Sequence, residues 1–224
     1  MKKTIILIAL IFVSIATMSQ TKYGVRAGMS LSSYNFAQGN FQFKPGINIG
    51  AVADIPIGSS KFSFLTGLYF ADKGTKVEGH DFWITDKKAS VGNDYYIKVM
   101  DYNYQLEIPL LFTYRIPINE KLTLKPHIGA FVSYTMFGRI YEEMGYLVMG
   151  SPIFHIETSR DYYFYDDIYL GLGGNVGLSV FYNKYSFTLS CDVGYNNHPR
   201  TTEFFYPNNN YPNICMFFSL GYNF

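Results

Sequence analysis

The sequence predicts an all-β fold: an eight-stranded antiparallel up-and-down transmembrane β-barrel preceded by a cleavable signal peptide. Apolar side chains recur at every second position in eight segments of the chain. This period is typical of strands whose two faces meet different surroundings. The connections between these segments alternate between short and long, as they do in outer-membrane barrels. The N-terminus carries the pattern of an export signal.

The predicted signal peptide covers residues 1–19. Two lysines follow Met1, residues 5–16 are apolar, and small side chains follow up to Ser19; these are the three regions of a secretory signal. The apolar run is shorter than the roughly 20 residues of a membrane-spanning helix. We place cleavage after Ser19, with cleavage after Ala16 as the alternative, so that residues 20–224 form the barrel domain.

The connections divide the domain into strands. Short turns are predicted at residues 57–61, 116–121 and 181–184, and longer connections at 34–43, 72–101, 138–165 and 196–213. The predicted strands are 23–32, 46–55, 62–71, 104–115, 122–136, 168–180, 185–195 and 216–224. An even number of strands puts both termini on the periplasmic side, as export of the chain requires.

The fourth strand departs from this simple plan in two ways. Residues 95–100, within the second long connection, are expected to extend a strand beyond the membrane. Pro109 lies inside the strand and has no backbone N–H to donate, so a bulge or a local break in the ladder is predicted there.

Alternation alone does not say which face of the wall points outward. The apolar faces are continuous over eight to ten residues, which is about the length of a tilted strand crossing a membrane. The opposite faces are rich in Gly, Ser, Thr and Asn, which suit the cramped interior of eight strands. A soluble lipocalin-like barrel, with its apolar side chains inside, is the alternative.

The last segment has the pattern of a C-terminal sorting strand. Its alternating apolar residues are Met216, Phe218, Leu220, Tyr222 and Phe224. A soluble edge strand is normally protected by charge, proline or a bulge, whereas no charged residue follows Glu203 here. We therefore expect this strand to close a barrel and to be recognised by the barrel assembly machinery. An amphipathic strand in a soluble sandwich is the alternative.

Several short motifs, taken in order, resemble the PorT-like outer-membrane β-barrel family of Gram-negative envelopes. They are Lys22-Tyr23-Gly24-Val25-Arg26-Ala27-Gly28, Gly67-Leu68-Tyr69 to Lys73-Gly74, Leu106-Glu107-Ile108-Pro109-Leu110-Leu111, Gly171-Leu172-Gly173-Gly174-Asn175-Val176-Gly177 and Leu220-Gly221-Tyr222-Asn223-Phe224. The resemblance spans the mature chain and implies an eight-stranded barrel in the outer membrane. Some PorT-like proteins assist a secretion system, but these motifs imply no particular activity.

Charged residues on the polar faces predict an ion-pair network inside the barrel. The residues concerned are Arg26, Asp54, Glu107, Arg115, Lys125, His127 and Asp192. Three carboxylates and three permanently charged bases nearly balance, and buried charges must be paired or hydrated. We expect the network to fill the lumen; a proton or ion path is the alternative, and a diffusive pore is disfavoured at this barrel size.

Composition argues against other chemistry. The net charge of +1 gives no basic field for nucleic acid, and Cys191 and Cys215 are expected to stay unbridged. Ser133 and His127 lie on one strand, but six residues separate them by roughly 20 Å; His155 beside Ser151 or Ser159 is left as a loop alternative. We predict no catalytic residue, no metal site and no cofactor.

The sequence therefore predicts a non-enzymatic, monomeric outer-membrane barrel that acts structurally or through its external loops. Its expected partners are membrane lipid, the barrel assembly machinery, and an envelope protein or surface glycan. Trp83 and Tyr163 are the candidate loop contacts, since exposed aromatic residues make adaptable contacts. A small-solute channel or a secretion-system accessory barrel is the second interpretation, and a soluble periplasmic ligand-binding barrel is the third.

Overall fold

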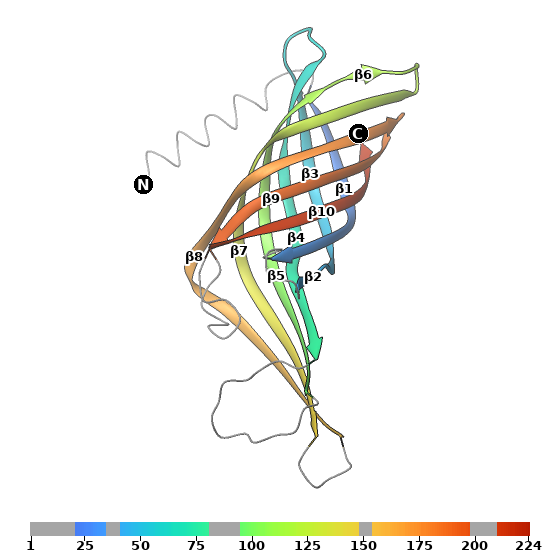
Figure 1. Ribbon diagram of the computed structural model, residues 1–224. Helices are drawn as coiled ribbons and strands as arrows, with labels where there is room; N and C mark the ends of the chain where they lie inside the picture. Colours follow the sequence, from blue (N-terminus) through green and yellow to red (C-terminus); the bar gives the residue numbers. More distant parts are fainter. Residues whose placement is uncertain (1–20, 35–40, 81–94, 148–153, 198–209) are drawn as a thin grey trace.

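A computed structural model of the chain describes residues 21–34, 41–80, 95–147, 154–197 and 210–224 (Figure 1). These residues form β-strands joined by short turns. The strands are β1 (Lys22–Tyr34), β2 (Phe41–Gln42), β3 (Lys44–Pro56), β4 (Phe62–His80), β5 (Tyr95–Tyr114), β6 (Ile116–Pro117), β7 (Leu122–Leu147), β8 (Phe154–Tyr182), β9 (Tyr185–Asn197) and β10 (Asn210–Asn223). No helix among the described residues is long and apolar enough to cross a membrane.

Eight long strands close into a ring. Their order around the wall is β1, β3, β4, β5, β7, β8, β9 and β10, and every neighbouring pair is antiparallel. The ring closes where β1 meets β10, with Gly24 opposite Asn223. The two-residue strands β2 and β6 lie off the ring, against β4 and β7. The predicted eight-stranded up-and-down barrel is confirmed.

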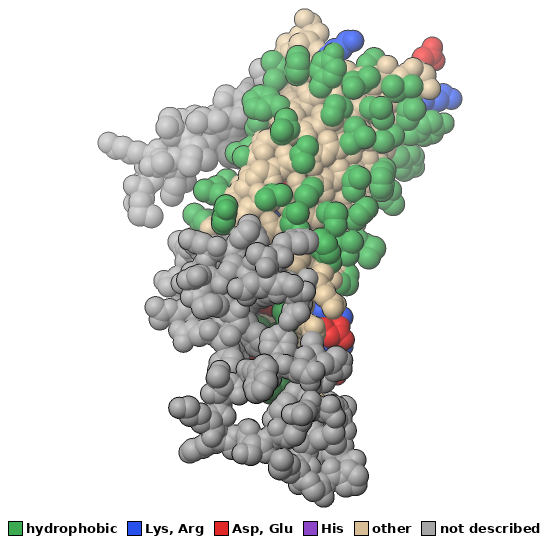
Figure 2. All heavy atoms as spheres, viewed as in Figure 1, with side chains coloured by type: hydrophobic (Ala, Val, Ile, Leu, Met, Phe, Trp, Pro, Cys, Tyr) green, Lys and Arg blue, Asp and Glu red, His purple; other side chains and the backbone are tan. Residues whose placement is uncertain are grey.

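The apolar face of the wall points outward. Figure 2 shows hydrophobic side chains spread over the visible surface of the barrel. The exposed residues include Val25, Met29, Ile47, Ile49, Leu68, Phe112, Ile128, Leu172, Val176, Leu189, Val193 and Leu220. The buried positions between them are mostly serine, threonine, asparagine and charged residues. This arrangement is that of a barrel whose solvent is lipid, and it is the reverse of a soluble lipocalin-like barrel.

The two ends of the barrel differ. At the short-turn end, uppermost in Figure 1, residues 57–61, 118–121 and 183–184 connect neighbouring strands. At the extended end, β4, β5, β7 and β8 continue past the ring as a four-stranded sheet. Its pairing reaches His80 with Tyr96 and Leu147 with Phe154.

The extended end corrects the predicted strand boundaries. Residues 72–80, 138–147 and 154–165 form strands where the sequence pattern predicts long connections, and the last strand begins at Asn210 rather than Met216. The expected extension over 95–100 is confirmed. Beyond the ring the sheet does not separate lipid from a polar lumen, so its sequence loses the clean alternation that marks the wall.

After Ala71, β4 leaves β3 and packs against the inner face of β1. The hydroxyl of Ser30 donates a hydrogen bond of 2.8 Å to the backbone oxygen of Asp72, and the N–H of Gly74 donates one of 2.8 Å to Ser32 Oγ. A Cβ at Gly46 would lie 2.3 Å from the Asp72 oxygen. Small residues on the inner wall therefore allow β4 to narrow the mouth of the barrel.

The β5 ladders have two irregularities. Pairing with β4 stops at Thr66 opposite Leu110 and resumes at Tyr69 opposite Glu107, so Pro109 causes the predicted local break. On the other side of β5, the register with β7 shifts between Tyr104 and Gln105. That shift is a bulge on β7, which adds one residue where the wall passes into the extended sheet.

Candidate functional site in the barrel lumen

Six of the seven charged residues assigned to the lumen are buried inside the ring. They are Arg26, Asp54, Glu107, Lys125, His127 and Asp192. The seventh, Arg115, is half-buried between β5 and β6 at the short-turn end. The period-two alternation places these side chains inside, because each lies on the face opposite the exposed apolar residues.

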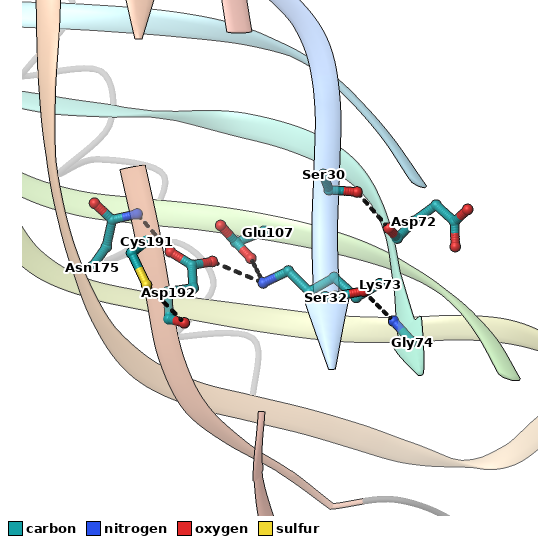
Figure 3. Close-up of polar contacts among 9 residues, drawn as sticks. All are labelled: Ser30, Ser32, Asp72, Lys73, Gly74, Glu107, Asn175, Cys191 and Asp192. Atoms are coloured by element: carbon teal, nitrogen blue, oxygen red, sulfur yellow. Dashed lines mark hydrogen bonds and ion pairs between the residues drawn. The ribbon is translucent and has the colours of Figure 1, made fainter. Parts of the chain in front are cut away.

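Lys73 lies at the centre of the network, although the sequence pattern predicts a connection at its position. Its Nζ atom is 2.5 Å from Glu107 Oε2 on β5 and 2.8 Å from Asp192 Oδ2 on β9. The side chain is 0% exposed. Figure 3 shows it reaching from β4 across the lumen to both carboxylates. One cation therefore joins opposite walls of the barrel.

Neighbouring side chains complete this central plug. The amide of Asn175 donates a hydrogen bond of 2.5 Å to Asp192 Oδ1. The Lys73 ammonium also lies 4.5 Å from the ring centroid of Phe131 and 5.2 Å from that of Phe217. Two carboxylates and two aromatic faces thus surround the Lys73 ammonium, and the Asn175 amide holds one of those carboxylates in place. These contacts replace most of the hydration that the ammonium would have in water.

A second ion pair lies closer to the short-turn end. Lys125 on β7 donates to Asp54 on β3, with its ammonium 4.9 Å from the ring centroid of Phe181. Between this pair and the central plug, a Cβ at Gly177 would lie 2.4 Å from His127 Nε2, so the imidazole occupies the space that the glycine leaves. Side chains therefore fill the lumen at more than one height along the barrel axis.

A third cluster lies where β4 narrows the mouth. Lys44 Nζ is 2.6 Å from Asp72 Oδ1. The ring of Tyr102 is close to two cations, with its centroid 4.1 Å from Lys44 Nζ and 4.4 Å from the Arg139 guanidinium carbon. Strands β3, β4, β5 and β7 are joined by these contacts. They fix the base of the extended sheet to the barrel.

The sequence interpretation missed Lys44, Asp72 and Lys73. A signal for Lys73 was present, because the inward-facing positions Ser63, Leu65, Ala71, Lys73 and Thr75 continue one alternation along β4. The predicted strand ends at residue 71, two positions before Lys73. Lys44 likewise continues the inward-facing positions Asn48 and Asp54 of β3, two residues before the predicted start of that strand. Asp72 carries no such signal, since its pairing with Lys44 depends on β4 crossing over the inner wall.

A small cavity remains between the plug and the wall. It encloses about 30 Å³ and is lined by Arg26, Asn48, Tyr69, Glu107, His127, Asn175 and neighbouring residues. A site for one ordered water needs about 10–15 Å³, so the cavity suits about two waters. It is too small for an organic substrate, and its polar lining suits internal hydration.

The remaining predicted residues are placed as follows. Met216, Phe218, Leu220 and Tyr222 lie in β10, which pairs with both β1 and β9. Phe224 follows the strand, and its N–H donates a hydrogen bond of 3.0 Å to Tyr23 O. The backbone of Tyr163 pairs with Gly138 in the β7–β8 ladder. Trp83 and the signal-peptide residues 1–19 lie outside the described residues.

Comparison with protein-family models identifies this architecture. Residues 18–197 match the model described as "Outer membrane protein beta-barrel domain". The chain belongs to this outer-membrane β-barrel family. Among curated proteins, no match to the chain was found. The family places this barrel in the outer membrane, where its outward apolar face meets lipid.

Solved structures of other small barrels are similar to this family member. Ail of Yersinia pestis is 12% identical over 91% of this chain and 98% of that one, with a TM-score of 0.35. Neisserial surface protein A is 16% identical over 90% and 97%, with a TM-score of 0.36. OprG of Pseudomonas aeruginosa is 13% identical over 91% and 95%, with a TM-score of 0.33.

Proposed function

We propose that this outer-membrane barrel is a closed, non-enzymatic interaction protein whose extended sheet binds a partner outside the membrane. The observation that carries the proposal is the continuation of β4, β5, β7 and β8 beyond the ring as one hydrogen-bonded sheet. Crossing the membrane does not require strands of 26 and 29 residues, because about 9–11 residues suffice. The extra length forms a rigid platform on which residues can be presented.

The interior supports a closed barrel rather than a small-solute channel. Lys73 spans the lumen between Glu107 and Asp192, and Phe131, which is 0% exposed, lies against it. Eight-stranded interiors are just wide enough for side chains to fill. The central ionic groups bind one another, which leaves none of them free to act as a nucleophile or general base.

Orientation follows from the asymmetry of the two ends. Outer-membrane barrels have short turns in the periplasm and longer segments outside. The short-turn end carries both Lys22 at the start of β1 and Phe224 after β10, so both termini belong in the periplasm and the extended sheet belongs outside. Export through the predicted signal peptide of residues 1–19 would deliver the chain to this location in a Gram-negative envelope.

An envelope protein is the partner that we propose for the extended sheet. A secretion-system accessory barrel is the second candidate function. A surface glycan is the other candidate ligand, since the sheet and its flanking segments are rich in tyrosine. The two kinds of partner are distinguished by what becomes cross-linked to the sheet.

Photo-cross-linking should place the partner on the extended sheet. A photoreactive residue at exposed position 160 in β8 is expected to give one recurrent adduct in cells. The same residue at position 172, nearer the short-turn end of β8 and in the lipid-facing wall, should give no such adduct. Mass spectrometry of the adducts distinguishes protein from glycan. Equal adducts at both positions would contradict a binding role for the sheet.

Shortening the hairpin provides the complementary test. Residues 140–161 can be replaced by Asn-Gly, which would join the paired residues Arg139 and Tyr162 by a tight turn. The ring uses the parts of β7 and β8 between this point and the short-turn end, so the variant should still show the heat-modifiable gel mobility of a folded barrel. Partner recovery should fall to background. Undiminished recovery would exclude the β7–β8 extension as the binding surface.

Conductance measurements test the closed lumen. The purified barrel in a planar bilayer is expected to show no conductance steps above background, because side chains from opposite walls meet in its centre. Phe131→Gly combined with Phe217→Ala should introduce measurable leakage and shows that the assay is sensitive. Stable steps from the unaltered barrel would favour the channel interpretation.

A further inference from the structure

Lysine recurs at the same structural position around the short-turn end. Lys61, Lys121 and Lys184 each end a turn immediately before a strand begins, and Lys22 begins β1. All four side chains are exposed. Together with the half-buried Arg115 they form what we call the basic rim. Figure 2 shows basic side chains protruding at this end above the hydrophobic surface.

Backbone hydrogen bonds hold the basic rim in place. The oxygen of Lys61 accepts a bond of 2.8 Å from the N–H of Arg115 in the next turn. In the same way, Lys121 O accepts from the N–H of Asn183 at 2.9 Å, and Lys184 O accepts from the N–H of Asn223 at 2.8 Å. The backbones of these three lysines are thus fixed to the next connection or, for Lys184, to the end of β10, so that their side chains start from positions spaced around the barrel.

The charge of the basic rim is unbalanced. Its five basic side chains compare with one exposed acidic residue in the same turns, Glu120. Asp54 also lies near this end, but it is buried and paired with Lys125. The described part of the extended sheet is more nearly balanced, because its exposed or half-buried acids Glu78, Glu142 and Glu143 offset three of the four corresponding bases, which are Lys76, Lys98, Arg139 and Arg160. Among the described residues, the excess of positive charge is therefore larger at the short-turn end.

Aromatic side chains lie directly beside the rim on the lipid-facing wall. Tyr23, Phe62 and Tyr185 each follow a rim lysine in the chain and are 49%, 54% and 65% exposed. The Lys184 ammonium lies 5.7 Å from the ring centroid of Tyr222. Aromatic belts mark the level of lipid headgroups, and lysine stems extend along such surfaces with their charges towards water. The rim charges therefore lie at headgroup depth.

We propose that the basic rim binds anionic glycerophospholipids of the adjoining leaflet, with the lysines contacting phosphate-bearing headgroups and the aromatic side chains contacting the upper acyl chains. The periplasmic leaflet is the one concerned, so this inference rests on the orientation proposed above. A lysine near an anionic membrane surface strengthens binding by about fivefold. Removing three should therefore weaken retention of such lipids by about a hundredfold.

Native mass spectrometry of the purified full chain in neutral detergent tests this inference. Phosphatidylglycerol and phosphatidylcholine share acyl chains and differ in net charge, so they serve as the paired probes. The rim variant combines Lys61→Gln, Lys121→Gln and Lys184→Gln. The matched control removes three charges from the extended sheet through Lys76→Gln, Lys98→Gln and Arg160→Gln. Gel mobility before and after heating establishes that every variant is folded.

Phosphatidylglycerol should be retained over phosphatidylcholine by the unaltered chain and by the control, and this preference should disappear in the rim variant. Equal retention by the rim variant would overturn the proposal. Complete displacement of phosphatidylglycerol by inorganic phosphate would also overturn the proposal, because it would identify a simple anion site. Labelling of Lys61→Cys in intact cells tests orientation separately: labelling from outside would overturn the orientation, whatever the lipid measurement shows.

Discussion

Replacing Lys73 with methionine is expected to destabilise the folded barrel by about 3–5 kcal/mol, the range for breaking a buried ion pair from one side. Lys73 is 0% exposed and lies within 2.8 Å of both Glu107 and Asp192. Methionine fills similar space but supplies no charge. Two carboxylates would then remain buried together without a cation, at a point in the lumen that little water reaches.

The loss of stability is measured by urea unfolding of the barrel in lipid vesicles, with the folded fraction determined from gel mobility. The control is Lys76→Met, which breaks the partly exposed Lys76–Glu78 pair on the same strand. A pair of that kind contributes only about 0–1 kcal/mol. If Lys73→Met and Lys76→Met unfold at the same urea concentration, Lys73 does not hold the barrel together.

A combined variant separates charge from packing. Lys73→Met together with Glu107→Gln and Asp192→Asn removes the cation and both carboxylates while keeping side chains of similar volume. Replacing a complete buried ion network is often nearly neutral for stability. Most of the lost stability should therefore return. Continued instability of the triple variant would show that shape, rather than unpaired charge, explains the effect of Lys73→Met.

Ile128→Arg is expected to destabilise the barrel by about 2–4 kcal/mol, the cost of arginine near the middle of a lipid-facing wall. Ile128 is 65% exposed on the outside of β7. Along β7 it lies between Leu122 at the short-turn end and Phe137, where the wall passes into the extended sheet. At that level the ring of Phe137 packs against the ring of Tyr104, with 4.6 Å between their centroids. On a wall facing water the same substitution would cost little, because the side chain has few protein contacts to lose.

Ile118→Arg is the matched control. Ile118 is also an exposed isoleucine, 54% accessible, but it belongs to a turn at the short-turn end. Near the membrane interface the cost of arginine falls to about 0–1 kcal/mol. Unfolding from vesicles should therefore distinguish the two variants clearly. Two equally small effects would mean that Ile128 does not face lipid.

The wall could be predicted from sequence because one physical contrast controls it. Lipid lies on one side and a narrow polar lumen on the other, so alternate residues such as Leu189 and Ser190, or Leu220 and Ser219, must differ. The extended sheet could not be bounded in this way. Its polar composition matches that of a loop, and its stability comes from pairing with strands distant in the chain.

The sequence by itself determined the number of wall strands, their antiparallel order and most of the charged residues that lie inside. Only the tertiary structure decided which charges meet. Lys73 and Asp192 are separated by 119 positions and come together because ring closure places β4 opposite β9. The alternation of apolar and polar residues predicts on which face of a strand a side chain lies. The tilt of the strands, their register and the crossing of β4 over β1 determine which residues that side chain contacts.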